Sequence, residues 1–397
     1  MLLFYVFFHL FTFSGDYSKM DGIKAGGGDS GMKAVYEIMH GERNVARVDT
    51  QGRCKVYDAR FMPFNLYLEE TEGSDMDADI DTLVNNVTNF YYWCSMRILT
   101  LDRRYAKEIL NSIGAAQAVT DRDRAQIALT YHCLSLTDIF WVKKEGEEIS
   151  FREINLYDNH LDNAFVDVSL RGKQITVQND SLIPDLTTNG CFPKAWVRME
   201  NGFRLLKDGD SEYVENELLA SRVCQCFRCR QVVYEEDEYE GEKVSSSQIM
   251  TSKRYSIVSR EAFEIYAVNH EIDALEYILD LDRYSYHMMN ILDYLVGNTD
   301  RHWGNWGFLV DNETNRPVSL HPLMDFNQAF RSYDTVEGAN CQTMLPERMT
   351  QMEAAVYAVK QIGLNQAAEI RKEWFEGRER EYGMLMRRLE VLKMYEE

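Results

Sequence analysis

The sequence lacks several features that would assign it to a common protein class. It has no excess of basic residues, because 64 Asp and Glu outweigh 43 Lys and Arg and the formal net charge is −21. Phosphate backbones are bound by basic surfaces, so this charge excludes a broad nucleic-acid-binding face but not a small positive pocket. The eight cysteines are too scattered for a disulfide scaffold in 397 residues, which favours a reducing compartment. No internal repeat or long low-complexity tract is present.

An apolar run occupies residues 1–13 (MLLFYVFFHLFTF). A membrane-spanning helix needs about 20 apolar residues, so this run is too short to cross a bilayer. No Lys or Arg precedes it, as a secretory signal would require. The glycine-rich stretch 24–29 separates it from the rest of the chain. We therefore expect residues 1–31 to be a tail outside the fold, with an export or anchoring signal as the alternative.

Residues 32–174 are predicted to form an accessory α/β module. Apolar and polar residues alternate in 33–60, which indicates strands. Helical spacing replaces this alternation in 79–135, and Asp121 marks the start of one helix there. One predicted apolar helix face consists of Ile80, Leu83, Val84 and Val87.

Residues 175–252 are mostly predicted as strands, and residues 253–397 mostly as helices. In the first region two strands join through the turn at 200–202, a helix is predicted over 212–229, and a hairpin follows at 231–250. This order predicts an α+β, two-lobed fold. A β-rich N-lobe is followed by a mainly helical C-lobe, and the accessory module precedes both.

One motif within the helical half carries the chemistry. It reads Gly297-Asn298-Thr299-Asp300-Arg301-His302-Trp303-Gly304-Asn305. Apolar residues at helical spacing between 288 and 295 predict a buried helix before it, and a Gly-Asn pair can end such a helix. Asp300 then opens an irregular loop at the end of a rigid element.

A predicted hairpin brings a second acid to this loop. Short strands at 306–310 and 318–321 are joined by a polar turn, so Asn305 and Asp325 should lie close together although they are distant in the chain. An amide oxygen and a carboxylate oxygen suit Mg²⁺, which binds few protein ligands. Asp300 adds a carboxylate that can orient a hydroxyl, as phosphoryl transfer requires. The alternative is that these residues only form turns.

Two stretches resemble one known family. The run from Asp300 to Asn305 is similar to the catalytic loop of HipA-like kinases, which share a superfamily with lipid kinases of the phosphatidylinositol type. Met324-Asp325-Phe326-Asn327 resembles the metal-binding Asp-Phe-Gly motif, with Asn327 in place of the glycine. The resemblance covers residues 33–365 and implies a bilobal, protein-kinase-like fold.

The same resemblance implies a role for each residue of the motif. Asp300 is the catalytic base, and His302 braces the loop around it. Asn305 and Asp325 hold Mg²⁺.

Residues further upstream resemble the nucleotide-binding part of the family. The turn at 184–190 is similar to one that covers phosphates with backbone N–H groups and small polar side chains, although an ordinary hairpin turn is the alternative. Its predicted binding residues are Thr187, Thr188, Asn189 and Gly190. Lys207 matches the strand lysine that contacts ATP phosphates, and Glu217 matches the helix glutamate that steadies it. Glu212 or Glu215 are alternatives for that glutamate.

The resemblance implies a bacterial, cytoplasmic kinase that uses ATP and Mg²⁺. Its expected acceptor is a Ser or Thr hydroxyl on a protein, the chain's own Thr187 or Thr188 included. Alternatives are a small-molecule or lipid kinase, and a non-catalytic nucleotide-binding member of a toxin–antitoxin pair. An antitoxin-like partner is implied, whereas direct nucleic-acid and membrane binding are not expected. The cysteines between 224 and 229 lack a nearby fourth ligand, so we expect buried thiols there and not a metal site.

Overall fold

The computed structural model describes residues 34–71, 79–98, 120–159, 194–200, 202–207, 211–239, 241–343 and 348–396. The predicted tail at 1–31 and the predicted phosphate-covering turn at 184–190 lie outside the described residues.

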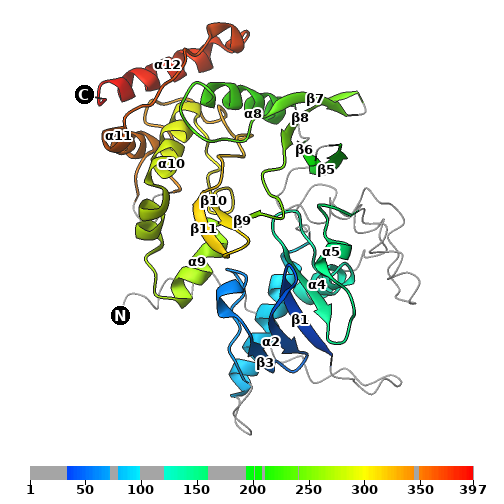
Figure 1. Ribbon diagram of the computed structural model, residues 1–397. Coiled ribbons are helices and arrows are strands. Elements are labelled where there is room, and N and C mark those ends of the chain that lie inside the picture. The colour runs from blue at the N-terminus through cyan, green and yellow to red at the C-terminus, as the bar shows by residue number, and fades with distance from the viewer. Residues whose placement is uncertain are drawn as a thin grey trace. The chain divides into compact units, whose positions relative to one another are not determined.

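The first part of the chain contains an antiparallel sheet (Figure 1). Its strands are β1 (Val35–His40), β2 (Arg43–Asp49), β3 (Cys54–Val56) and β4 (Phe140–Lys144), in the order β3-β2-β1-β4. The strands form where the sequence predicts them, but burial does not alternate along them, because the last three residues of β1 are all buried and β2 buries neighbouring residues in pairs. The helices of this region are η2 (Ala59–Phe61), α2 (Ile80–Ser95), α4 (Asp121–Thr130) and α5 (Phe151–Ile154). Helix α4 starts at Asp121, as predicted, and Thr120 caps it.

Helix α2 lies where the spacing predicts it, but its predicted apolar face is wrong. Ile80 and Val84 are 74% and 56% exposed. The buried apolar side chains, Phe90 and Trp93, come later in the helix. The middle of the helix is instead anchored by buried Asn86, which donates hydrogen bonds to backbone carbonyls from two other segments.

A second antiparallel sheet and one helix come next in the chain. The strands are β5 (Lys194–Met199), β6 (Gly202–Lys207), β7 (Glu235–Tyr239) and β8 (Glu242–Gln248), in the order β5-β6-β8-β7, and helix α8 is Ser211–Cys224. These elements match the predicted strands and hairpin. Helix α8 ends before residue 229, because the chain turns away and the N–H of Arg228 donates to the carbonyl of Asn365.

The third sheet, of order β11-β10-β9, lies among the remaining helices (Figure 1). Its strands are β9 (Tyr255–Ser259), β10 (Gly307–Asp311) and β11 (Arg316–Leu320). The helices are α9 (Arg260–Asn269), α10 (Ala274–Val296), α11 (Gln351–Ile362), η3 (Lys372–Phe375) and α12 (Glu379–Lys393). The chain thus combines antiparallel sheets with helices, as the predicted α+β class requires. Among the described residues, none of the helices has the length and apolar content needed to cross a membrane.

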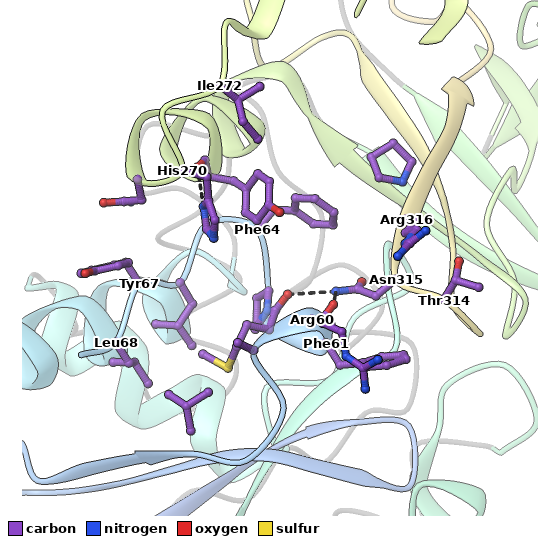
Figure 2. Close-up of a pocket in the computed structure, with 18 of the residues that line it drawn as sticks. Arg60, Phe61, Phe64, Tyr67, Leu68, His270, Ile272, Thr314, Asn315 and Arg316 are labelled. Carbon is purple, nitrogen blue, oxygen red and sulfur yellow. Dashed lines mark hydrogen bonds between the residues drawn. The ribbon is translucent and has the colours of Figure 1, made fainter. Parts of the chain in front are cut away.

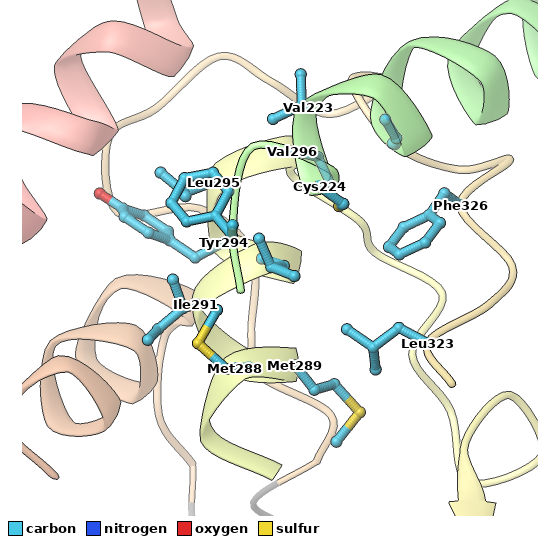
Figure 3. Packing of buried hydrophobic residues seen from close by; sticks show 14 of the residues in the cluster. Val223, Cys224, Met288, Met289, Ile291, Tyr294, Leu295, Val296, Leu323 and Phe326 are labelled. Carbon is cyan, nitrogen blue, oxygen red and sulfur yellow. The ribbon is translucent and has the colours of Figure 1, made fainter. Parts of the chain in front are cut away.

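The last turns of α10 form the core beneath the motif loop. Met288, Ile291 and Leu295 are fully buried there. Figure 3 shows them with Val223 of α8 and with Phe326, the residue after Asp325. Because interiors are close-packed, a helix end buried in this way holds the following loop in a fixed position.

Candidate active site

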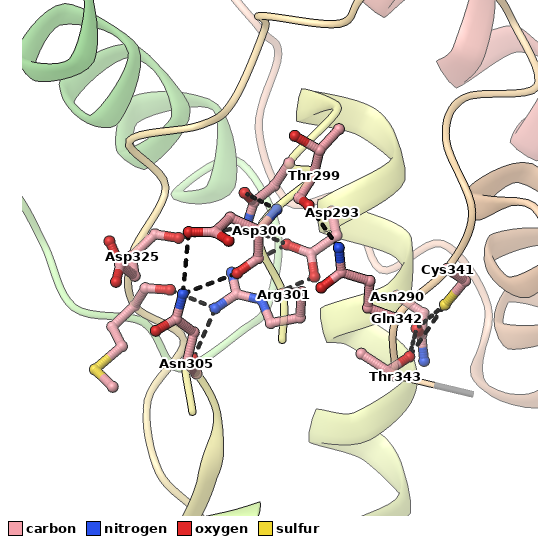
Figure 4. Close-up of polar contacts among 12 residues, drawn as sticks. Asn290, Asp293, Thr299, Asp300, Arg301, Asn305, Asp325, Cys341, Gln342 and Thr343 are labelled. Atoms are coloured by element: carbon pink, nitrogen blue, oxygen red, sulfur yellow. Dashed lines mark hydrogen bonds and ion pairs between the residues drawn. The ribbon is translucent and has the colours of Figure 1, made fainter. Parts of the chain in front are cut away.

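Arg301 connects the motif loop to its surroundings (Figure 4). Its guanidinium forms a two-pronged ion pair with Asp293 of α10, at 2.9 and 3.0 Å. Its Nη1 donates to the carbonyls of Asn305, at 2.9 Å, and Met324, at 2.5 Å. Arg301 is 2% exposed, so one buried side chain joins the helix end, the loop and the residue before Asp325.

Asp300 and Asn305 contact each other within the loop. Asn305 Nδ2 donates to the backbone carbonyl of Asp300 at 2.8 Å and lies 3.5 Å from its Oδ2. His302 Nε2 lies 4.0 Å from Asp300 Oδ1, and its Nδ1 accepts from the N–H of Gly304. Burial raises the pKa of the Asp300 carboxyl, His302 lowers it, and the nearby Asp325 carboxylate raises it, with a net rise above the ordinary value. The side chain remains 39% exposed and therefore accessible to a substrate.

A second group of charges surrounds Lys207. Its Nζ lies 2.6 Å from Glu217 Oε1 and 3.1 Å from Asp325 Oδ1. Burial alone would lower the pKa of Lys207, but these two carboxylates raise it well above its usual range. The alternative glutamates are elsewhere, because Glu212 and Glu215 are exposed. Lys207 therefore joins β6, α8 and the segment after β11.

Asp325 is held on its backbone as well as on its side chain. Its φ is 61°, which is uncommon for a residue with a side chain. Its N–H donates to the Tyr234 hydroxyl at 3.1 Å, and its carbonyl accepts from Asn298 Nδ2 at 3.3 Å. Burial would raise the pKa of the Asp325 carboxyl, but Lys207 and Lys194 lower it to about 2. The carboxylate is therefore charged at neutral pH.

The oxygens left at this site suit Mg²⁺. Lys207 engages Asp325 Oδ1, which leaves Oδ2. Asn305 uses its amide nitrogen toward Asp300, and within the described residues no hydrogen bond reaches its Oδ1. One carboxylate oxygen and one amide oxygen are hard ligands of the kind Mg²⁺ takes together with water and phosphate oxygens. The described ranges contain no metal-binding group of three or more His, Cys, Asp or Glu. The proposed ligand set is smaller and of another kind, with one aspartate and one asparagine.

Most of the predicted site residues thus lie in one network, namely Asp300, His302, Asn305, Lys207, Glu217 and Asp325. Thr187, Thr188, Asn189 and Gly190 lie outside the described residues.

Sequence reasoning missed several residues that orient this network. Ser245 donates to Glu217 Oε2 at 2.6 Å. The Tyr234 hydroxyl accepts from Lys207 Nζ at 3.3 Å. Neither residue lies in a motif. Ser245 is on β8 and Tyr234 precedes β7, so their contacts with the site become visible only in the folded structure. Arg301 stands inside the motif. Its partner Asp293 lies in the apolar last turns of α10, and an acid in such a stretch indicates a buried ion pair.

The cysteines between 224 and 229 are free thiols. Cys224 and Cys226 are buried, as predicted, whereas Cys229 is half-buried, and desolvation raises its pKa to about 12. Thiols with raised pKa values are poor metal ligands and weak nucleophiles at neutral pH.

A cavity of about 860 Å³ lies apart from this network. Its lining includes Phe61, Phe64, Tyr67, Tyr266, His270 and Arg316 (Figure 2). Asn315 crosses its wall and donates to the carbonyls of Arg60 and Met62, each at 3.0 Å. None of the predicted site residues that the structure describes lines this cavity.

Comparison with known proteins gives structural neighbours only. No protein-family profile matches the chain, and no curated protein matches it. The proinflammatory kinase CtkA of Helicobacter pylori is 14% identical with a TM-score of 0.41, over 53% of this chain and 91% of that one. HipA, from the structure of the Shewanella oneidensis MR-1 HipA–HipB toxin–antitoxin system with operator DNA, is 10% identical with a TM-score of 0.47, over 77% of this chain and 87% of that one. A HipA protein is therefore among the structural neighbours, as the sequence resemblance predicted.

Proposed function

We propose that this chain is an ATP- and Mg²⁺-dependent phosphotransferase with a bilobal, kinase-like arrangement. The observation that carries the proposal is the buried Lys207, which contacts both Glu217 and Asp325 beside the loop that bears Asp300. In the proposal the accessory module ends at residue 174, and the boundary between the two lobes lies after residue 252.

Each residue has one proposed task. Lys207 stays charged between its two carboxylates and binds phosphate oxygens. Asp325 and Asn305 hold Mg²⁺, which when bound neutralises charge on the phosphates. Asp300 orients the acceptor hydroxyl and accepts its proton, and its raised pKa makes it a better base than an ordinary carboxylate.

The proposed acceptor is a Ser or Thr hydroxyl on a protein, Thr187 or Thr188 of the chain itself included. We also propose that the protein works in the cytoplasm and binds an antitoxin-like partner. Free thiols at the described cysteines support a reducing compartment.

Asp300→Ala tests the proposal directly. We expect phosphate transfer from labelled ATP to fall by about 10²- to 10⁴-fold, because a positioned base is lost, while ATP binding persists through Lys207. Asp334→Ala is a matched control, because Asp334 is an exposed aspartate that pairs with Arg380. Unchanged transfer in Asp300→Ala would contradict the mechanism.

Incubation of the wild-type protein with labelled ATP and bacterial extract identifies the acceptor class. The expected result is that label enters protein and is released when phosphoserine and phosphothreonine are hydrolysed. Label in a small solute or lipid would replace the protein acceptor with the alternative kinase. No transfer with or without Mg²⁺ would overturn the proposed function.

A further inference from the structure

Asn298 contacts both of the segments that bear the catalytic carboxylates. Its Oδ1 accepts from the N–H of Asp300, and its Nδ2 donates to the carbonyl of Asp325, each at 3.3 Å. The same Nδ2 donates to Asp293 Oδ1 at 3.1 Å. Asn298 is 1% exposed, so water does not compete for these bonds. The side-chain amide of Asn298 therefore holds the backbone of Asp300 and the backbone of Asp325 at a fixed distance from each other.

Gln351, the first residue of α11, holds Asn298 in turn. Its Nε2 donates to the Asn298 carbonyl at 2.6 Å, and its Oε1 accepts from the N–H of Ala339 at 3.2 Å. A flipped amide would place oxygen against oxygen, so these two bonds allow a single orientation. Gln351 is 5% exposed, and its own N–H donates to the Ala339 carbonyl at 2.8 Å.

Gln342 makes the neighbouring contact. Its Nε2 donates to the carbonyl of Thr299 at 2.7 Å. Gln342 and Gln351 lie on facing segments, because the N–H of Cys341 donates to the carbonyl of Met349 at 2.8 Å and Asn340 bridges to Thr350. Two glutamines from one pair of segments thus reach consecutive carbonyls, those just before Asp300. We call Gln342 and Gln351 the loop clamp.

Little space remains between the loop clamp and the loop. The cavity lined by Asn298, Arg301, Gln342 and Gln351 has a volume of about 10 Å³. That is at the lower limit of the room that one water molecule needs. An apolar side chain of the same size as the clamp amide opens no further space for water, so a loop carbonyl loses its donor.

We propose that the loop clamp positions Asn298 and Thr299 so that Asp300 and Asp325 keep the geometry that phosphoryl transfer needs. This inference rests on the proposed function, which assigns roles to those two aspartates. Gln342 and Gln351 are positioning residues, since they act through the loop backbone. Lys207 and Glu217 lie on β6 and α8, outside the clamped loop, so loss of the clamp lowers turnover more than it lowers ATP affinity.

Gln351→Met tests the loop clamp, with Gln366→Met as matched control. Methionine keeps the side-chain volume and removes the donor. Among the described residues, the Gln366 side chain donates only to the nearby Ala368 carbonyl, far along the chain from the motif. In Gln351→Met we expect kcat to fall by about 10- to 100-fold, the loss that a misplacement near 1 Å causes, with KM for ATP changed by less than about twofold. Gln366→Met should match the wild type in both.

Hydrogen exchange of residues 297–305 in the nucleotide-free protein gives a second readout. Faster exchange there in Gln351→Met, but not in Gln366→Met, supports the clamp. Gln342→Ala, at a half-buried position, repeats both measurements should Gln351→Met not fold.

The two proposals fail in different ways. Wild-type kcat and exchange in the clamp variants, or an equal loss of turnover and ATP affinity, would overturn the clamp. A wild-type chain that transfers no phosphate would overturn the proposed function, and the exchange measurement alone would then decide whether the clamp holds the loop.

Discussion

At the scale of single residues, the site depends on how Lys207 keeps its charge while buried. Removal of an ammonium group from water costs several kcal/mol. Glu217 and Asp325 offset that cost by direct contact, at 2.6 and 3.1 Å. Ser245 completes the arrangement, because it donates to the second oxygen of Glu217 and faces Lys207 across strands β6 and β8. The position of the lysine therefore depends on a serine that no motif indicates.

We expect Ser245→Ala to lower both stability and ATP affinity. Loss of the Ser245 hydroxyl leaves one oxygen of the buried Glu217 unpaired, which should lower the free energy of unfolding by about 1–3 kcal/mol. KM for ATP should rise, because Glu217 then holds Lys207 less firmly. Urea denaturation and ATP kinetics measure the two effects.

Ser246→Ala is the control for this prediction. The Ser246 hydroxyl is buried without a hydrogen-bond partner among the described residues, so its removal should be neutral or stabilising. Equal effects of the two substitutions would show that the Ser245–Glu217 bond contributes nothing.

At the scale of elements, the end of α10 determines where the motif loop begins. Gly297 has a φ of 61°, and a Cβ at this position would lie 2.4 Å from the Tyr333 ring. The Tyr333 hydroxyl donates to the carbonyl of Leu295. Arg388 of α12 donates to the carbonyl of Tyr294 at 2.5 Å. Side chains from distant segments thus satisfy the last carbonyls of the helix, which would otherwise lack partners.

We expect Gly297→Ala to destabilise the protein more than Gly377→Ala. Both glycines have positive φ values, 61° and 74°, where a side chain costs about 1–2 kcal/mol. At Gly297 the clash with Tyr333 adds about 1–3 kcal/mol. Among the described residues nothing lies within 4 Å of a Cβ at Gly377. Urea denaturation compares the variants, and similar losses would mean that Tyr333 moves aside at no cost.

At the scale of the whole molecule, buried histidines in separate parts of the chain make stability depend on pH. Burial lowers the pKa of His40, His287 and His321 from 6.5 to about 4. Between these two values the unfolded chain binds more protons than the folded chain. Stability is therefore fully present above pH 6.5 and falls as the pH is lowered toward 4.

We expect urea titrations at about pH 7, 5.5 and 4.5 to show this decline in the free energy of unfolding. In His40→Phe the decline should be smaller, because one of the titrating groups is gone. Phenylalanine suits the position, because the His40 ring packs against Phe61 and Phe140 and its Nε2 has no partner in the described part of the chain. A stability profile that is flat between pH 6.5 and 4 would contradict the prediction.

The hydrophobic cores also concern the whole molecule. Phe64, from the predicted accessory module, packs in the cluster around α10, whereas Phe203 of β6 packs in the cluster of the first sheet. The regions on either side of the boundary at 174 thus share buried surface. The boundaries at 174 and 252 stay predictions.

Local patterns predicted the elements better than their faces and ends. The β10–β11 hairpin and the buried end of α10 follow from short-range periodicity. The buried face of α2 does not, because Asn86 is satisfied by carbonyls from residues remote in the chain. Helix α8 ends early for a similar reason, since the chain after it pairs with residue 365.

For the site, the amino-acid order establishes which charged and amide groups are available and how they are spaced, with Asp300, Asn305 and Asp325 around one hairpin. It does not establish which groups meet. Lys207 contacts an acid 118 positions away, and Asn298 is held by Gln351 from another helix. Contacts of this kind depend on how the intervening elements pack, and packing is a property of the folded molecule that no local spacing specifies.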